Sequence, residues 1–177
     1  MSSIAMIVPA KSEVKRSERP HWKHQTDALR FLESHPHAVL NMAMGTGKSR
    51  VFVERAIQLG ASRILILCPK SVVSVWAEQL AMWTHGDVTQ SAGNVIQAFS
   101  SDGLPVYLFN DGTSENKADA LAWILRFQQK FVVVVNYDSV YRKRFGLSIM
   151  CAGFQLIGLD EIHRIKMPGG KASRFVQ

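Results

Sequence analysis

The stretch Met44-Gly45-Thr46-Gly47-Lys48-Ser49 decides the fold class of this chain. Two closely spaced glycines let the backbone curl so that successive N–H groups face inward, which forms a nest for anions. At the start of a helix such a nest binds phosphate oxygens, and Lys48 can reach the β- and γ-phosphates while Ser49 offers a hydroxyl to Mg²⁺. The strict pattern G-x-x-x-x-G-K-[ST] has its first glycine at position 42, where this chain has Met42.

The segments around this loop support that interpretation. Residues 37–42 (HAVLNM) are short and mostly apolar, which predicts a buried strand. Residues 48–59 carry apolar side chains at helical spacing and are followed by Gly60, a typical residue after a helix end. A chance glycine turn before a surface lysine is the competing explanation, and the strand–loop–helix setting disfavours it.

A second candidate site follows the apolar run at residues 156–159, which ends in Asp160 and Glu161. An aspartate at the carboxyl end of a strand can hold magnesium, and the next carboxylate can orient or deprotonate an attacking water. Alone, this pattern fits a strand that runs into a solvated turn equally well. Together with the upstream loop, it predicts a nucleotide site.

The rest of the chain predicts an α/β fold. We expect helices over residues 24–34, 71–83 and 115–129, and strands over residues 63–68, 106–109, 131–135 and 154–159. Continuous apolar strands that alternate with helices indicate a mostly parallel sheet with helices on both faces. Residues 84–103 give no clear signal.

Composition narrows the class of protein. The chain has 177 residues, 47% hydrophobic and 20% charged, which is typical of one globular domain. It shows neither a membrane-length apolar run nor a basic leader, so we expect a cytoplasmic or nucleoid-associated protein that is not secreted. Cys68 and Cys151 form no metal-ligand pattern and should stay reduced. The net charge of +7 favours a polyanionic partner, although an ordinary basic surface explains it as well.

With these motifs in place, the sequence resembles the first RecA-like lobe of superfamily 2 helicases and translocases, and the Swi/Snf-type subgroup looks closest. Asp160-Glu161-Ile162-His163 is similar to the DEAH-like box of motif II, and residues 164–173 (RIKMPGGKAS) resemble the pattern that follows it. Residues 64–76 (ILILCPKSVVSVW) resemble motif Ia, residues 132–137 (VVVVNY) the next motif, and His24-Gln25 the Q motif. Together these segments cover most of residues 20–173.

The resemblance implies a P-loop NTPase lobe that uses ATP and Mg²⁺, and it assigns a role to each matching residue. Gln25 would contact adenine, and Gly45, Thr46, Gly47, Lys48 and Ser49 would hold phosphates and, through Ser49, the metal. Asp160 would hold Mg²⁺, Glu161 would position water, and His163 would couple the ATP site to motif III. Pro69, Lys70, Ser71 and Tyr137 would lie at the nucleic-acid face.

The same resemblance shapes our expectation of domain organisation. Residues 1–20 would form a flexible arm, and residues 21–177 would form lobe 1, truncated after motif II, without motif III or the second lobe. Family members bind ATP between two lobes, and the second lobe supplies an arginine finger. We therefore expect nucleic acid, DNA more than RNA, and a second lobe as partners, no membrane, and very slow ATP hydrolysis by this lobe alone.

Several alternatives stay open at this point. The chain could be a nucleotide- and nucleic-acid-binding module without turnover, or an RNA-directed helicase lobe. A small P-loop kinase is disfavoured because it has no use for the box at residues 160–163. Trp76 and Trp83 share an apolar helix face, which favours core packing over base stacking. Tyr137 could cap the sheet instead of touching DNA, and the charge run at residues 142–144 is more typical of a solvated face.

Overall fold

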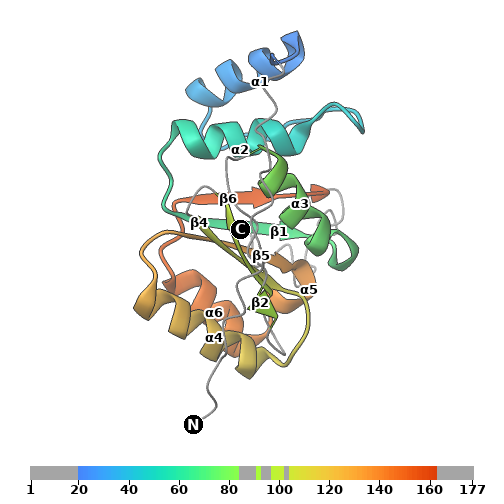
Figure 1. Cartoon of the computed structure of the whole chain (residues 1–177). Helices are drawn as coiled ribbons and strands as arrows, with labels where there is room; N and C mark the ends of the chain where they lie inside the picture. The colour runs from blue at the N-terminus through green and yellow to red at the C-terminus, as the bar shows by residue number, and fades with distance from the viewer. Residues whose placement is uncertain (1–19, 84–90, 93–96, 102–103, 163–177) are drawn as a thin grey trace.

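A computed structural model describes residues 20–83, 91–92, 97–101 and 104–162. Its centre is a six-stranded sheet in the order β2-β3-β4-β5-β1-β6 (Figure 1). The strands β4, β5, β1 and β6 run parallel, whereas β2 and β3 extend the sheet antiparallel to β4. The strands are β1 Arg63–Cys68, β2 Ser91–Ala92, β3 Gln97–Ser101, β4 Leu104–Phe109, β5 Phe131–Asn136 and β6 Leu156–Leu159.

Helices cover both faces of this sheet, as the sequence predicts (Figure 1). They are α1 Lys23–Ser34, α2 Lys48–Gln58, α3 Val73–Trp83 after the short 3-10 turn η1 Lys70–Val72, α4 Ser114–Phe127, α5 Tyr137–Val140 and α6 Lys143–Cys151. Successive side chains of a strand point to opposite faces. In β1, Ile64 and Ile66 pack with α2 and α3, whereas Leu65 and Leu67 pack with α4 and α6. The continuous apolar strands are therefore buried on both sides.

The helix α1 lies outside this three-layer arrangement and stacks on α2 (Figure 1). Ala28 and Leu29 of α1 contact Val51 of α2, which is fully buried. This packing brings the beginning of α1 close to the loop that precedes α2.

The predicted strand at residues 37–42 is wrong. Residues 38–43 form no regular structure, and the side chain of Val39 is 64% exposed. A strand requires a hydrogen-bonded neighbour, and this segment pairs with no strand in the described part of the chain. Its alternate apolar residues Leu40 and Met42 pack instead on the α1–α2 cluster. The other half of that prediction is confirmed, because α2 begins at Lys48.

The sequence interpretation also missed elements. The strands β2 and β3 lie within residues 84–103, where no element was assigned. The helix α6 was hidden by the charge run at residues 142–144, which caps and begins it. Phe145 and Ile149 of this helix are four residues apart and both buried. That spacing is a helical signal, and the sequence contains it. Within the described ranges, no helix combines the length and apolarity that a bilayer crossing demands.

Candidate nucleotide site and nucleic-acid face

The glycine-rich loop adopts the curled backbone that its sequence predicts. Gly45 and Gly47 have φ values of 76° and 81°, in the left-handed region that favours glycine, and Gly47 is the N-cap of α2. The Lys48 ammonium turns back over the loop and donates to the carbonyls of Met42 and Ala43 at 3.0 and 3.1 Å. An ammonium has three donors, so two are engaged within the loop itself.

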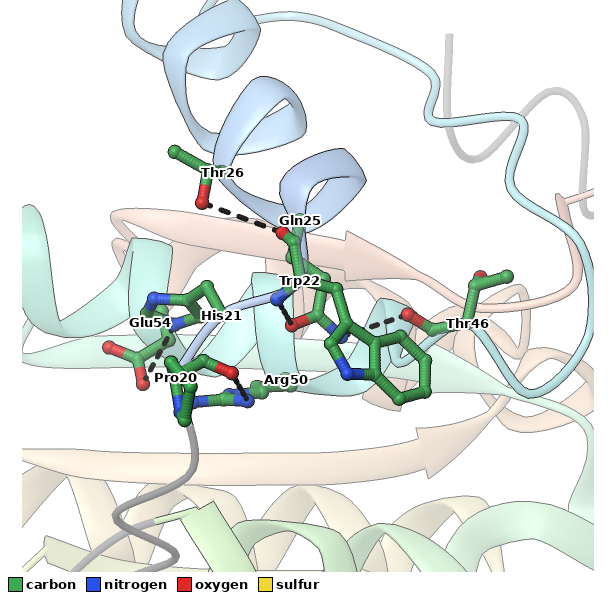
Figure 2. A network of polar contacts seen from close by, with 8 residues as sticks. All are labelled: Pro20, His21, Trp22, Gln25, Thr26, Thr46, Arg50 and Glu54. Atoms are coloured by element: carbon green, nitrogen blue, oxygen red, sulfur yellow. Dashed lines mark hydrogen bonds and ion pairs between the residues drawn. The ribbon is translucent and has the colours of Figure 1, made fainter.

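Side chains of α1 hold this loop from the other side (Figure 2). The amide nitrogen of Gln25 donates to the Thr46 carbonyl at 3.0 Å, and the His24 imidazole lies 3.0 Å from the same oxygen. The amide oxygen of Gln25 accepts from the backbone N–H of Trp22 at 3.2 Å, which gives the N-cap residue of α1 a hydrogen-bond partner. Gln25 is therefore buried beside the loop with both ends of its amide bonded to backbone.

Residues before α1 are tied to α2 (Figure 2). The Arg50 guanidinium donates to the Pro20 carbonyl at 3.3 Å, and the His21 ring lies 3.4 Å from the Glu54 carboxylate. Arg50 also stacks over the Trp83 ring at 4.8 Å, so the same guanidinium joins α2 to α3. The start of α1 is thus held above the loop.

Asp160 lies where the sequence predicts, directly after a strand that pairs parallel with β1. Its backbone N–H donates to Leu67 at 2.8 Å, which extends the ladder by one residue. Its carboxylate oxygen Oδ2 accepts from the Trp76 indole at 2.9 Å, and its carbonyl accepts from the Tyr137 hydroxyl at 2.6 Å. Two of these bonds fix the backbone of Asp160, and the bond from Trp76 fixes its carboxylate.

The position of Tyr137 corrects one expectation. It was placed at the nucleic-acid face, but its side chain is only 7% exposed and its hydroxyl is held beneath Asp160. Burial, and then the nearby charge of Asp160, raise the pKa of Tyr137. It follows a fully buried strand, and the alternative that it caps the sheet is the one the structure supports. The same causes raise the pKa of the buried Cys68 thiol to about 12.

Ser49 lies on the same side of the sheet as Asp160. Its hydroxyl lies 2.7 Å from the amide oxygen of Gln79, and the Trp83 indole donates to that oxygen at 3.2 Å. Gln79 and Trp76 are three residues apart on α3, so they share one helix face. One face of α3 thus reaches both residues expected to hold the metal. The sequence interpretation missed Gln79, because its contact with Ser49 joins elements 30 residues apart and no local pattern reports it.

The oxygen ligands fit magnesium. Mg²⁺ is usually bound through one or two carboxylates together with phosphates and water, so Ser49 and Asp160 suffice on the protein side. No cluster of three or more His, Cys, Asp or Glu that could form a self-sufficient metal site occurs in the part of the chain described. Glu161, next to Asp160, has a φ of 55°, which is uncommon for a residue with a side chain. His163 lies outside the described residues.

The expected nucleic-acid residues divide by exposure. Lys70 and Ser71 of η1 are exposed, whereas Pro69 is buried and can only set the direction of the chain. Lys70 borders a cavity of about 790 Å³ at the carboxyl ends of β4 and β5. The cations lining that cavity are Lys70, Lys117, Arg142 and Arg144, and its other lining residues include Asn110, Asp111, Thr113, Ser114 and Asn136.

Lys117 forms the floor of this cavity and was not foreseen. Its side chain is 3% exposed, and its ammonium donates to the Ser139 hydroxyl at 2.8 Å and the Phe109 carbonyl at 3.3 Å. Burial lowers the pKa of this lysine, and the nearby Asp111 partly opposes that effect. The buried cation attracts anions to the cavity, whereas Asp111, Glu115 and Asp138, which also line it, repel them.

A mostly parallel sheet with a glycine loop before α2 and a carboxylate at the end of β6 fits a RecA-like lobe, and the family match identifies a helicase-type, ATP-binding lobe of superfamily 2. The family described as "Type III restriction enzyme, res subunit" matches residues 13–174, and the chain belongs to that family. Proteins of this superfamily generally use ATP and Mg²⁺ and act on nucleic acid with a second lobe. A comparison with curated proteins found no match.

Proposed function

We propose that this chain binds ATP and Mg²⁺ and, joined to a second RecA-like lobe, hydrolyses ATP to drive movement along DNA, as Swi/Snf-type translocases do. One observation carries the proposal. The Ser49 hydroxyl and the Asp160 carboxylate contact side chains one turn apart on α3, beside a curled glycine loop. A hydroxyl, a carboxylate and an anion nest on one side of a sheet are what an Mg²⁺-nucleotide requires.

Different residues of the loop would bind different parts of the nucleotide. The backbone N–H groups of Gly45, Thr46 and Gly47 and the start of α2 would bind phosphate oxygens. Lys48 would turn its third N–H, or exchange its bonds to Met42 and Ala43, toward the β- and γ-phosphates. Ser49 and Asp160 would hold Mg²⁺, which neutralises phosphate charge when bound.

Glu161 is the proposed water-positioning residue. Its left-handed backbone costs on the order of 1 kcal/mol for a residue with a side chain. Such conformations cluster at functional sites, where surrounding structure enforces them. We propose that His163 couples the ATP site to motif III.

Gln25 is the proposed adenine contact. Its amide lies beside the loop, but it bonds the Thr46 carbonyl and the Trp22 N–H. Adenine would have to replace the bond to Thr46, while the His24 ring, which lies 3.0 Å from the same carbonyl, would still join α1 to the loop. We expect Gln25→Ala to reduce the preference for adenine over guanine nucleotides.

Nucleic acid would follow the exposed turn η1 before α3. Lys70 and Ser71 lie there, and Arg142 and Arg144 line the cavity that Lys70 borders. Lysine and arginine contacts to phosphates are insensitive to sequence and strongly salt-dependent. Lys70 also pairs with Asp111 at 3.3 Å, and a DNA phosphate would have to compete with that carboxylate. We propose that residues 21–177 form one lobe with this face beside its ATP site.

A binding module without turnover is the second candidate. The charge that develops on the γ-phosphate in the transition state needs donors from both sides of the cleft. The favouring observation is that Lys48 and Ser49 are engaged with Ala43 and Gln79 within the lobe. In this view the lobe holds nucleotide, and hydrolysis awaits a second lobe.

The test is calorimetry with the Mg²⁺ complexes of ADP and ATP. A hydrogen bond to a charged group contributes about 1.5–3 kcal/mol, so Lys48→Ala should weaken binding roughly tenfold or more. Lys130→Ala, an exposed lysine before β5, is the matched control and should bind as the wild type does. Glu161→Gln should also bind normally, yet abolish turnover once a second lobe is supplied. Wild-type affinity in Lys48→Ala would contradict the assignment.

A further inference from the structure

Two side chains of α3 engage the two residues proposed to hold the metal. Trp76 donates its indole N–H to Asp160 Oδ2 at 2.9 Å. Gln79 Oε1 lies 2.7 Å from the Ser49 hydroxyl oxygen. Neither side chain belongs to the glycine loop or to the carboxylate box, so neither is accounted for by the proposed function.

We propose that Trp76 and Gln79 are positioning residues, which orient the Asp160 carboxylate and the Ser49 hydroxyl so that their free lone pairs meet the same cation. This inference rests on the proposed function, because it assumes an Mg²⁺-nucleotide site at Ser49 and Asp160. It adds that the metal geometry is set by one face of α3 and not by the loop and strand alone.

The orientation of the Gln79 amide follows from Trp83. The Trp83 indole nitrogen lies 3.2 Å from Gln79 Oε1, and an indole N–H can only donate. The atom facing Trp83 must therefore be the amide oxygen and not the amide nitrogen. Because the same oxygen also faces Ser49, the Ser49 hydroxyl must be the donor of that bond. Its proton points toward Gln79, and its lone pairs are left for a cation.

The indole beside Asp160 leaves the negative charge of the carboxylate unneutralised. Indole N–H is neutral, so it fixes the carboxylate without cancelling its negative charge, as a lysine or arginine in its place would. It bonds Oδ2, and within the described ranges no hydrogen bond to Oδ1 occurs. The carboxylate thus keeps its charge and one oxygen for the metal.

The indole itself cannot move easily. Trp76 is 6% exposed, and the Phe52 ring meets it edge-on at 5.7 Å between centroids. Phe52 in turn lies against Gly158 of β6, where an added Cβ would come within 2.5 Å of its ring. Phe52 of α2 therefore contacts both Trp76 of α3 and Gly158 of β6, and Gly158 lies two residues before Asp160. Such packing holds a donor at a fixed position, as a preorganised site requires.

The test compares ADP affinity with Mg²⁺ and in excess chelator, by calorimetry on the whole chain. Trp76→Phe keeps an aromatic ring against Phe52 but removes the N–H, and Gln79→Met removes the acceptor. In each variant the ratio of ADP affinity with Mg²⁺ to ADP affinity in chelator should fall roughly tenfold. The ADP affinity in chelator should stay at the wild-type value. Gln79→Glu keeps an acceptor for Ser49 and Trp83 and should retain the Mg²⁺ effect.

Trp123→Phe is the control for the aromatic substitution, because Trp123 is half exposed on α4, across the sheet, and should change neither affinity. Thermal denaturation identifies a variant that merely unfolds. Equal losses with and without Mg²⁺, or none in either variant, would overturn the positioning role while leaving the proposed function standing. A wild-type chain that binds no ADP in either condition would overturn both.

Discussion

The two halves of the nucleotide site are held in place by different means. The loop half follows an irregular segment, and its contacts are bonds from side chains to backbone carbonyls, such as those of Gln25 to Thr46 and of Lys48 to Met42. The carboxylate half follows a strand of the sheet, and Asp160 is bonded by the buried side chains of Trp76 and Tyr137. The loop half is therefore stabilised by hydrogen bonds to the loop backbone, and the carboxylate half is stabilised by side chains of the core.

This difference predicts where a substitution will be felt. Local openings cost little free energy where few apolar contacts are buried and approach the global stability inside a core. Changes in the loop should therefore alter nucleotide affinity more than they alter the unfolding transition. Changes around Asp160 should alter both.

The largest effect should come from Gly47→Ala. Its φ of 81° costs a residue with a side chain about 1–2 kcal/mol, and the new Cβ would lie 2.4 Å from the Gln25 amide nitrogen. Displacing Gln25 also sacrifices its bond to Thr46, a further ~1 kcal/mol. We expect ADP affinity, measured by calorimetry, to fall by roughly ten- to a hundredfold with a small shift in the melting temperature.

Gly45→Ala is the matched variant for this experiment. Gly45 has a similar φ of 76°, but an added Cβ there meets nothing within 4 Å. It should carry only the backbone cost, so its affinity should lie between those of the wild type and Gly47→Ala. If the two variants lose the same affinity, the α1 contact contributes nothing to the loop.

A second, smaller effect should appear at the carboxylate half in Gly158→Ala. The added Cβ would press on the Phe52 ring, and overpacking of this kind costs about 1–3 kcal/mol. We expect a lower midpoint in urea denaturation together with weaker Mg²⁺-dependent ADP binding, because Phe52 supports Trp76. In a Phe52→Leu background the same substitution should cost less, and a double-mutant cycle with no coupling would refute this contact.

The sequence predicted the half of the site that depends on the core. The apolar runs of β1 and β5 were correctly predicted as buried strands, and the carboxyl end of β6 delivers Asp160. The loop conformation was also predictable, because glycine spacing reports backbone geometry directly. Residues 37–42 misled because an apolar run specifies burial but not pairing, and Leu40 and Met42 are partly buried against helices.

Contacts between distant elements could not be predicted from the sequence. The bonds from Trp76 to Asp160 and from Tyr137 to Asp160 span 84 and 23 residues. Their partners are set by the packing of α3 and the order of the strands, and no local pattern contains that information. Tyr137 was consequently assigned to the surface although it lies in the core.

The smallest predicted effect concerns Cys68, at the end of β1 below Asp160. Burial raises the pKa of its thiol from 9.0 to about 12, so the folded state keeps a proton that the unfolded state loses. The stability this gives is complete below pH 9 and is lost as pH rises toward 12, by at most about 1.4 kcal/mol per unit. Cys68→Ala removes the thiol, so the stability gap between wild type and variant should narrow above pH 9. Denaturation in urea from pH 8 to 10 measures that gap, and the opposing titration of Lys117 cancels because both proteins contain it. A gap that stays constant over this range would mean that the thiol ionises as freely in the folded chain as in the unfolded one, and the carboxylate half would then be less closed to water than the core contacts imply.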